Sequence, residues 1–212
     1  KNIRKNGLIA LNLREGDELL RAKITYGDAD IIFVTQDGNA IRFNETDVRP
    51  MGRTASGVKA ISLREGDVAV CMDIAVEDEK LLVVSENGYG KRTNLDEYKV
   101  QNRGGIGLIT YKVSDKTGKV VGATVCKEDD ELMLINNQGV AIRINVSDIS
   151  VTSRSAMGVK LMRTLEDEAV VTIAKISGDT NEEEEEMTLL DEPEDTNIIV
   201  EEVATEVKDE EN

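Results

Sequence analysis

Short apolar runs separated by turn residues follow one another through the first 178 residues of the chain. In the first 44 residues the runs occupy positions 8–11, 19–25, 31–35 and 40–43. Short β-branched runs are typical of strands, and the Asp-Gly and Asn-Gly pairs at 37–38 and 87–88 are typical of hairpin turns. The pattern therefore predicts an all-β fold.

Four sequence markers return at a spacing of 50 or 51 residues. Arginine-to-glycine segments end at Gly7, Gly57, Gly107 and Gly158, turn glycines stand at 38, 88 and 139, strand arginines at 42, 92 and 143, and asparagines at 44, 94 and 145. A fixed period of this size indicates stacked supersecondary units. We expect a propeller-like array of four-stranded blades of about 50 residues each.

The units predicted from this period run from about 7–56, 57–106 and 107–157, with a partial unit at 158–178. A radial β array needs about four to eight blades to close. The chain therefore predicts a partial ring of three to four blades, the C-terminal part of a larger ring.

Charge is concentrated at the C-terminal end. Residues 179–212 hold sixteen acidic residues and one basic residue, Lys208, which is −15 of the net −16. Residues 1–178 are nearly neutral, with 25 basic and 26 acidic residues. We expect an acidic tail that is disordered and either competes with an anionic partner for basic surfaces or only increases solubility.

Composition excludes several kinds of chemistry. The chain has no His, no phosphate-binding loop motif and no nucleophile-elbow motif, so we expect no catalytic residue and no metal site in it. Cys71 and Cys126 form no C-x-x-C motif and are expected to be buried free thiols. The apolar runs are too short to cross a membrane, and we expect a cytoplasmic protein without membrane contact.

Several segments then point to a family. Tyr-Gly-Lys-Arg-Thr at 89–93, Glu-Tyr at 97–98 and Gln-Asn-Arg-Gly-Gly-Ile-Gly at 101–107 resemble the C-terminal domain of the gyrase A protein of DNA gyrase, which is a type IIA topoisomerase. Residues 48–58 and 148–151 look like linkers between later blades of that domain. The resemblance covers essentially all of 1–178. The related C-terminal domain of topoisomerase IV is the nearest alternative.

The resemblance implies a β-pinwheel, usually of six blades, that bends duplex DNA around its rim. In the bacterial holoenzyme, this wrapping supports ATP-dependent negative supercoiling. The implied partners are double-stranded DNA, the gyrase B protein, and the rest of the gyrase A protein. ATP and magnesium belong to other domains, so no cofactor is implied for this chain. The catalytic tyrosine also belongs to another domain.

A seven-residue box, Gln-Arg-Arg-Gly-Gly-Lys-Gly, is needed for wrapping in the family. Asn102 and Ile106 depart from it, and both replace a cation. The box therefore implies either weaker wrapping or a true box in an upstream blade. The matching positions, expected to bind DNA, are Gln101, Arg103, Gly104, Gly105 and Gly107.

Arginine and glycine together suit phosphate binding, because glycine opens the backbone and the guanidinium presents several donors. With no long basic helix and few aromatic residues, we expect sequence-tolerant binding that depends on DNA shape. Bending is expected to need the full ring. Further candidate DNA contacts are Arg4, Lys5, Arg42, Arg49, Arg53, Lys59, Lys91, Arg92, Lys99, Arg143, Arg154 and Lys160.

Structural alternatives remain for these residues. The glycines could simply shape the crossing between blades. The strand arginines could pair with the acidic residues five positions later, at 47, 97 and 148. A propeller that docks proteins without wrapping DNA is the alternative function, and it would require apolar linkers rather than basic ones.

Overall fold

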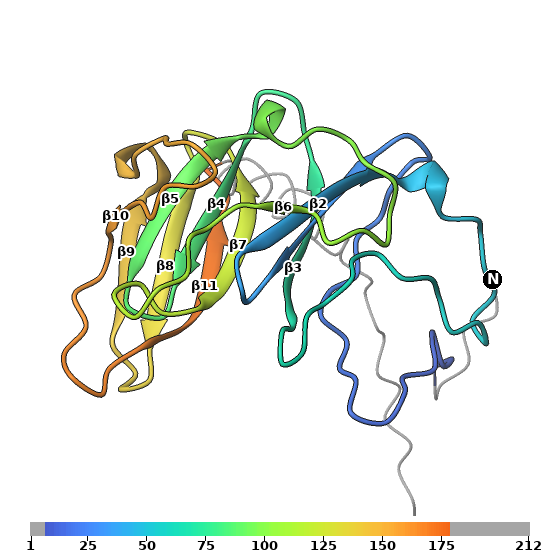
Figure 1. The fold of residues 1–212 in the computed structure, drawn as a ribbon, viewed down its shortest axis with the longest axis horizontal. Helices are drawn as coiled ribbons and strands as arrows, with labels where there is room; N and C mark the ends of the chain where they lie inside the picture. Colours follow the sequence, from blue (N-terminus) through green and yellow to red (C-terminus); the bar gives the residue numbers. More distant parts are fainter. Residues whose placement is uncertain (1–6, 179–212) are drawn as a thin grey trace, which may run out of the picture. The chain divides into compact units, whose positions relative to one another are not determined.

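The computed structural model describes residues 7–178, so the acidic tail and the candidates Arg4 and Lys5 lie outside the described residues. The described part is all-β, as the sequence predicts, with strands joined in antiparallel sheets and only single-turn 3-10 helices besides (Figure 1). These short helices are η1 (Glu45–Asp47), η2 (Leu95–Glu97) and η3 (Val146–Asp148). No helix in this part is long and apolar enough to cross a membrane.

The described strands form three sheets. The first sheet has the order β3 (Ala69–Ala75), β1 (Asp30–Thr35), β2 (Asn39–Asn44) and β6 (Leu108–Ile109). The second has the order β10 (Val159–Lys160), β5 (Tyr89–Asn94), β4 (Lys80–Ser85) and β7 (Val120–Cys126). The third has the order β11 (Val170–Ile176), β8 (Glu131–Asn136) and β9 (Ala141–Asn145).

Each four-stranded sheet takes its strands from three successive sequence units. The central hairpin comes from one unit, one edge strand from the next unit, and the short strand at the other edge from the unit after that. In the first sheet, for example, β3 lies 25 residues and β6 more than 60 residues beyond the hairpin β1–β2. The sequence units and the sheets therefore do not coincide.

Two predicted strands are wrong for the same reason. Residues 8–11 and 19–25 are not strands, because strands at these places in the period pair with the hairpin of a preceding unit. The described residues contain no hairpin before residue 19. The later segment nevertheless lies beside β3, where Arg21 and Lys23 pair with Asp73 at 3.7 and 3.1 Å.

The core lies between neighbouring sheets. Ile32 of β1 and Leu81 of β4 belong to one buried cluster, and Leu82 of β4 and Leu132 of β8 belong to the next. Residues 81–84 are fully buried. Because both faces of this strand are covered, all four residues are apolar, whereas a strand with one exposed face would alternate apolar and polar residues. The strands β3, β7 and β11 lie side by side across the three sheets.

Both cysteines are free and buried, as expected. Burial raises the pKa of the Cys71 thiol and of the Cys126 thiol to about 12. Neither thiol is therefore a reactive nucleophile at neutral pH.

The hairpin tips fit closely against a later segment of the chain. A Cβ at Gly38 would lie 2.3 Å from the carbonyl oxygen of Tyr111, and a Cβ at Gly88 would lie 2.2 Å from that of Met162. Gly139, at the same place in the third hairpin, has nothing within 4 Å. All three have a positive φ, between 72° and 81°.

All three glycines have a left-handed backbone, but only Gly38 and Gly88 have close neighbours, so substitutions at these positions separate the cost of backbone strain from the cost of a steric clash. We expect Gly139→Ala to lower the free energy of unfolding by about 1–2 kcal/mol, the cost of a left-handed non-glycine residue. Gly38→Ala should lose a further 1–3 kcal/mol or so, because its Cβ overlaps a backbone oxygen. Urea unfolding measures both, and equal losses would contradict the close fit at the tip.

Candidate nucleic-acid interface

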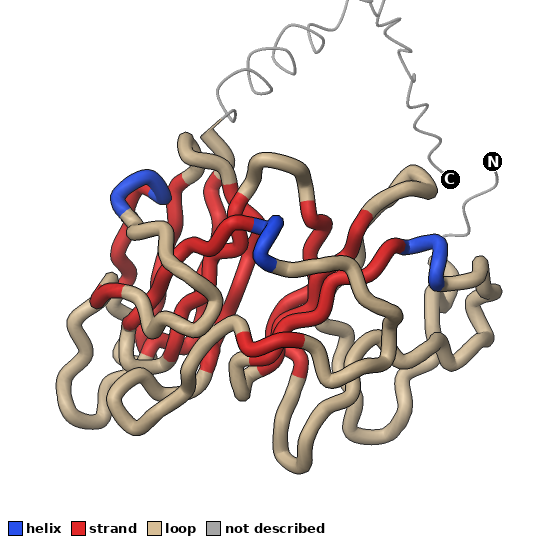
Figure 2. The backbone as a smooth tube through the Cα atoms, turned by 45° about the horizontal axis from the view of Figure 1, so that its top comes forward, coloured by secondary structure: helices blue, strands red, loops and turns tan. Residues whose placement is uncertain are grey.

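The segments that join successive units run along the edge of each sheet opposite the strands β3 and β7. Val100 forms a parallel bridge with Arg42, and Leu108 then pairs with Ala40, so residues 98–109 follow β2 from one end to the other. Residues 149–160 follow β5 in the same way. We call residues 48–60, 98–109 and 149–160 the linkers. Figure 2 shows that long loops run beside the sheets.

Arg53, Arg103 and Arg154, which precede the linker glycines, each contact an earlier segment of the chain. Arg103 donates to the carbonyl oxygens of Lys59 at 3.2 Å and Asp47 at 3.1 Å. Arg53 donates to Ile9 at 3.3 Å, and Arg154 donates to Ile109 at 3.1 Å. These arginines therefore hold successive linkers together, and part of their hydrogen-bonding capacity is used within the protein.

The box glycines differ in their steric surroundings. A Cβ at Gly107 would lie 2.3 Å from the carbonyl oxygen of Ala40, and one at Gly158 would lie 2.2 Å from that of Gly90. These two glycines are required by the crossing between sheets. Gly104 and Gly105 meet no atom closer than 3.7 Å, so contact with a neighbouring segment does not explain them.

The strand arginines form ion pairs, although not with the acidic residues predicted from the sequence. Arg42 pairs with Asp30 at 2.7 Å, and Arg143 pairs with Glu131 within its own hairpin. These are diagonal neighbours across the two hairpin strands, a relation that spacing along one strand does not reveal. The acidic residues predicted at 47, 97 and 148 form no ion pair with the described strand arginines.

Arg92 is buried and joins the second sheet to the third. Its guanidinium donates to the carbonyl oxygens of Ile149 at 2.7 Å and Ser147 at 3.1 Å, and to Glu128 at 2.5 Å. Hydrogen bonds from Lys80 and Arg92 lower the pKa of Glu128 to about 2. With 4% of its surface exposed, Arg92 offers no face to DNA.

Lys91 is also buried rather than exposed. It occupies the place that Ile41 and Ile142 have in the other hairpins, and its ammonium donates to the carbonyl oxygens of Ser153 at 2.6 Å and Arg154 at 2.5 Å. Burial lowers the pKa of Lys91 to about 8. Lys91 supports the third linker from within and is not available to a phosphate.

The remaining predicted contacts differ in exposure. Gln101 is half-buried, and its buried amide nitrogen has no hydrogen-bond partner among the described residues. Lys160 is exposed, donates to the carbonyl oxygen of Asn87 at 2.8 Å and lies over the Tyr89 ring.

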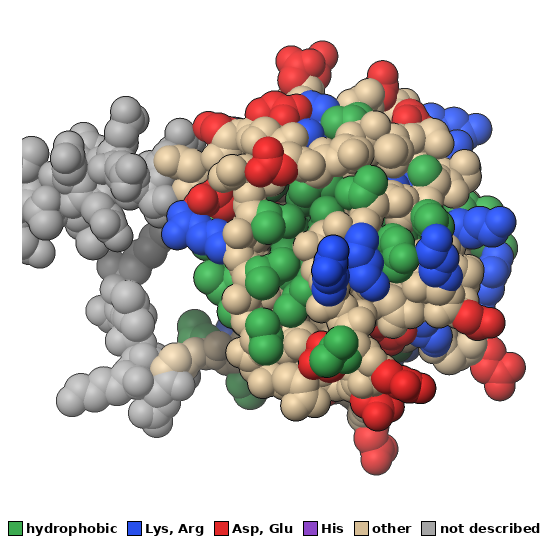
Figure 3. Space-filling model, turned by 90° about the vertical axis from the view of Figure 1, so that its left-hand side faces the viewer, with side chains coloured by type: hydrophobic (Ala, Val, Ile, Leu, Met, Phe, Trp, Pro, Cys, Tyr) green, Lys and Arg blue, Asp and Glu red, His purple; other side chains and the backbone are tan. Residues whose placement is uncertain are grey.

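Several exposed cations form no ion pair within residues 7–178. Three of them, Arg49, Lys59 and Lys99, are among the predicted contacts. The sequence repeat could have predicted three more: Lys112 and Arg163 stand at the same place in successive units, and Arg64 stands at the place of Arg14 in the unit before. On a separate face, the side on which β9 and β10 lie in Figure 1, Figure 3 shows further Lys and Arg side chains in a row, with acidic side chains above and below it. This face can accept a linear polyanion.

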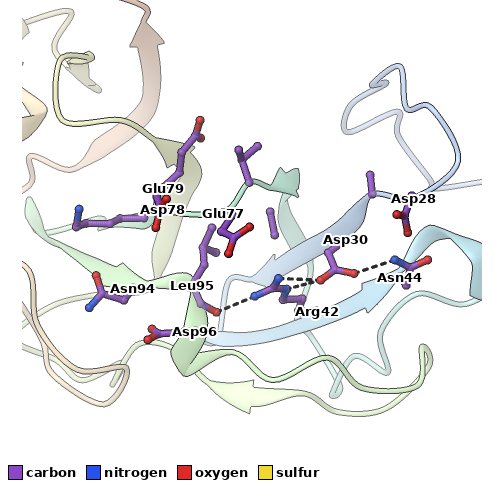
Figure 4. A pocket seen from close by; sticks show the side chains of 14 residues that line it. Asp28, Asp30, Arg42, Asn44, Glu77, Asp78, Glu79, Asn94, Leu95 and Asp96 are labelled. Carbon is purple, nitrogen blue, oxygen red and sulfur yellow. Dashed lines mark hydrogen bonds and ion pairs between the residues drawn. The ribbon is translucent and has the colours of Figure 1, made fainter.

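Two turns rich in acidic residues, at 28–30 and 77–79, converge elsewhere. A cavity of about 830 Å³ between the first and second sheets is lined by Arg42 and Lys80 and by six carboxylates (Figure 4). The carboxylates belong to Asp28, Asp30, Glu77, Asp78, Glu79 and Asp96. Within the described chain, no group of three or more residues is arranged to hold a metal ion. The cavity therefore repels phosphate and leaves the linkers as the candidate interface.

Comparison with known proteins gives consistent similarities. The sequence model of the family described as DNA gyrase C-terminal domain, beta-propeller, matches residues 1–25, 29–70, 79–127 and 130–177. The gyrase A protein of Clostridium acetobutylicum DNA gyrase is 69% identical over 186 residues, which is 88% of this chain and 22% of that protein. The gyrase A protein of Staphylococcus aureus strain NCTC 8325 is 44% identical over 196 residues, which is 90% of this chain and 22% of that protein.

Solved structures agree. A structure of a DNA gyrase A C-terminal domain superposes with a TM-score of 0.74 at 34% identity, covering 82% of this chain and 59% of that chain. A C-terminal domain of DNA topoisomerase IV superposes with a TM-score of 0.82 at 26% identity, covering 89% and 59%. The chain spans about a fifth of the length of the curated relatives.

The hydrogen bonds by which Arg92 joins the second sheet to the third can be tested by mutation. Arg92→Gln should lower the free energy of unfolding by about 1.5–3 kcal/mol, because it leaves two carbonyl oxygens without their charged donor. The matched change Arg143→Gln, at a side chain that is 58% exposed, should cost less than about 0.5 kcal/mol. Chemical unfolding followed by circular dichroism compares them, and a cost at Arg143 equal to that at Arg92 would contradict the junction.

Proposed function

The chain belongs to the family of DNA gyrase C-terminal domains with a β-propeller fold, and from this premise we propose that it is the duplex-DNA binding and wrapping module of a gyrase A protein. In this role it bends DNA beside the catalytic core and supports ATP-dependent negative supercoiling by the holoenzyme. The domain performs no catalysis itself and needs no cofactor of its own.

The observation that supports this proposal best is the set of exposed linker cations without ion pairs. Arg49, Lys59 and Lys99 stand at linker positions, and no described carboxylate neutralises them. Duplex affinity comes mainly from neutralised phosphates and the release of condensed counterions. Cations repeated along successive sheet edges suit a path along the DNA backbone better than one local contact.

Base readout has little support within residues 7–178. No described helix is longer than a single turn, so none can enter the major groove. Tyr98 and Tyr111 are buried and cannot stack on bases. Binding should therefore tolerate sequence and depend on the shape and bending of the duplex.

The backbone alone does not distinguish gyrase from topoisomerase IV, since both kinds of domain superpose well. The sequence does, because the curated relatives named above are gyrase A proteins. The linkers expose apolar side chains as well as cations, Val100, Ile106 and Ile109 among them, so protein docking is weighed against by the family match and not by the exposed surface. The gyrase B protein, together with the rest of the gyrase A protein, completes the proposed assembly, in the bacterial cytoplasm at the chromosome.

The proposal predicts how salt dependence changes with charge. Lys59→Gln and Lys99→Gln should each lower duplex affinity and reduce the log–log salt slope by about 0.9. Lys80→Gln, which removes a cation that lines the acidic cavity, should leave the slope unchanged. Fluorescence anisotropy with a mixed-sequence duplex at several salt concentrations measures the slopes.

Two outcomes would contradict the proposed binding mode. Slopes that respond equally to all three changes would show that the linkers are not the interface. A wild-type slope near zero would exclude binding through phosphates altogether.

A further inference from the structure

The box in the second linker lacks two cations of the family pattern, and its remaining arginine is partly occupied. Arg103 donates to two carbonyl oxygens of the protein, and Ile106 stands where the pattern has lysine. The side chains of residues 103–107, here called the glycine linker, therefore supply little free charge. Its backbone has an unusual arrangement that the charge pattern does not reveal.

Ser62 turns two successive peptide units of the glycine linker in the same direction. The hydroxyl of Ser62 donates to the carbonyl oxygen of Gly104 at 2.8 Å, and the backbone N–H of Ser62 donates to that of Gly105 at 2.8 Å. The N–H of Gly104 in turn donates to Ala60 at 2.6 Å. Both carbonyl groups therefore point toward one residue, which is half-buried.

The two following N–H groups must point the other way. In a trans peptide the C=O of one residue and the N–H of the next are antiparallel, and no described peptide bond is cis. The N–H groups of Gly105 and Ile106 therefore point away from Ser62. Both residues are exposed, and neither N–H has an acceptor among the described residues.

Successive N–H groups beside a residue in the left-handed region form a concavity that binds anions. Gly104 supplies that conformation, with a φ of +83°. A Cβ added at Gly105 would meet no atom closer than a methyl group of Ile41 at 3.7 Å, so no neighbouring segment crowds this residue. The left-handed conformation explains the glycine at 104.

We propose that the N–H groups of Gly105 and Ile106 bind a phosphate of the DNA backbone and that Ser62 is the positioning residue for this site. The inference rests on the proposed DNA-binding function and adds the contact through which the box acts. A main-chain site needs no side-chain charge at 106, so isoleucine at this position is compatible with phosphate binding.

The site belongs to this linker. Asn12 and Lys112 stand at the places equivalent to Ser62 in the neighbouring units, and neither side chain forms a hydrogen bond to a described linker. The third linker is held differently, by Lys91 and by the Tyr111 hydroxyl, which donates to Met157 at 2.8 Å.

The test compares Ser62→Ala with Ser62→Thr and with Ser147→Ala, a control at an exposed hydroxyl that has no hydrogen bond to a described residue. Duplex affinity is measured in the full chain over a range of salt. We expect Ser62→Ala to weaken binding about three- to tenfold, the effect of one or two hydrogen bonds. The salt slope should not change, because the N–H groups are neutral. Threonine should restore affinity, and Ser147→Ala should have no effect.

A second measurement needs no variant. Inorganic phosphate added to the ¹⁵N-labelled chain at constant ionic strength should shift the amide resonances of Gly105 and Ile106 more than those of Gly52 and Gly57 in the first linker. Resonances that do not move would overturn the site.

The outcomes distinguish this inference from the function on which it rests. Wild-type affinity in Ser62→Ala would overturn the phosphate site and leave DNA binding intact. A reduced slope in Ser62→Ala would also overturn it, since a change in the placement of cations would then explain the loss. Failure of the unaltered chain to bind duplex would overturn both.

Discussion

Neighbouring sheets in this domain are joined through one arginine of each of the first two hairpins. Arg42 reaches the carbonyl oxygen of Leu95 at 3.0 Å, and Arg92 reaches two carbonyl oxygens around η3. The backbones of the same two residues bridge the linkers that follow. A buried guanidinium with several acceptors in fixed directions allows few alternative geometries. The angle between sheets, and with it the course of each linker, therefore depends on these contacts.

The linkers acquire their surface properties from that arrangement. Because each linker follows the outer edge of a sheet, its free cations face solvent, while the acidic turns at 28–30 and 77–79 gather between the first and second sheets. The supports beneath the linkers also set the direction of their peptide groups, Ser62 under the second and Lys91 under the third. Residues that support the fold and residues proposed to contact DNA are thus distinct within one short segment. A count of charges along the sequence treats them alike.

Much of the fold follows from the sequence, because local chemistry determines it. Turn glycines, apolar runs and the repeat of about 50 residues predict hairpins and an all-β array. The exchange of strands between units is not predictable in this way, since pairing between distant segments has no local signal. Burial of Lys91 and the pairing of Arg42 with Asp30 depend on contacts across sheets and strands. The repeat itself indicates that Lys91 is buried, because lysine at 91 stands where the other hairpins have isoleucine.

The central claim is that the linkers, rather than the hairpin tips or the acidic cavity, bind duplex DNA. Hydrogen exchange measured by mass spectrometry, with and without a mixed-sequence duplex, tests it directly. The account predicts slower exchange in residues 48–60, 98–109 and 149–160, and unchanged exchange in the acidic turn at 77–79. Protection centred on that turn, or no protection in the linkers when the duplex is bound, would contradict it.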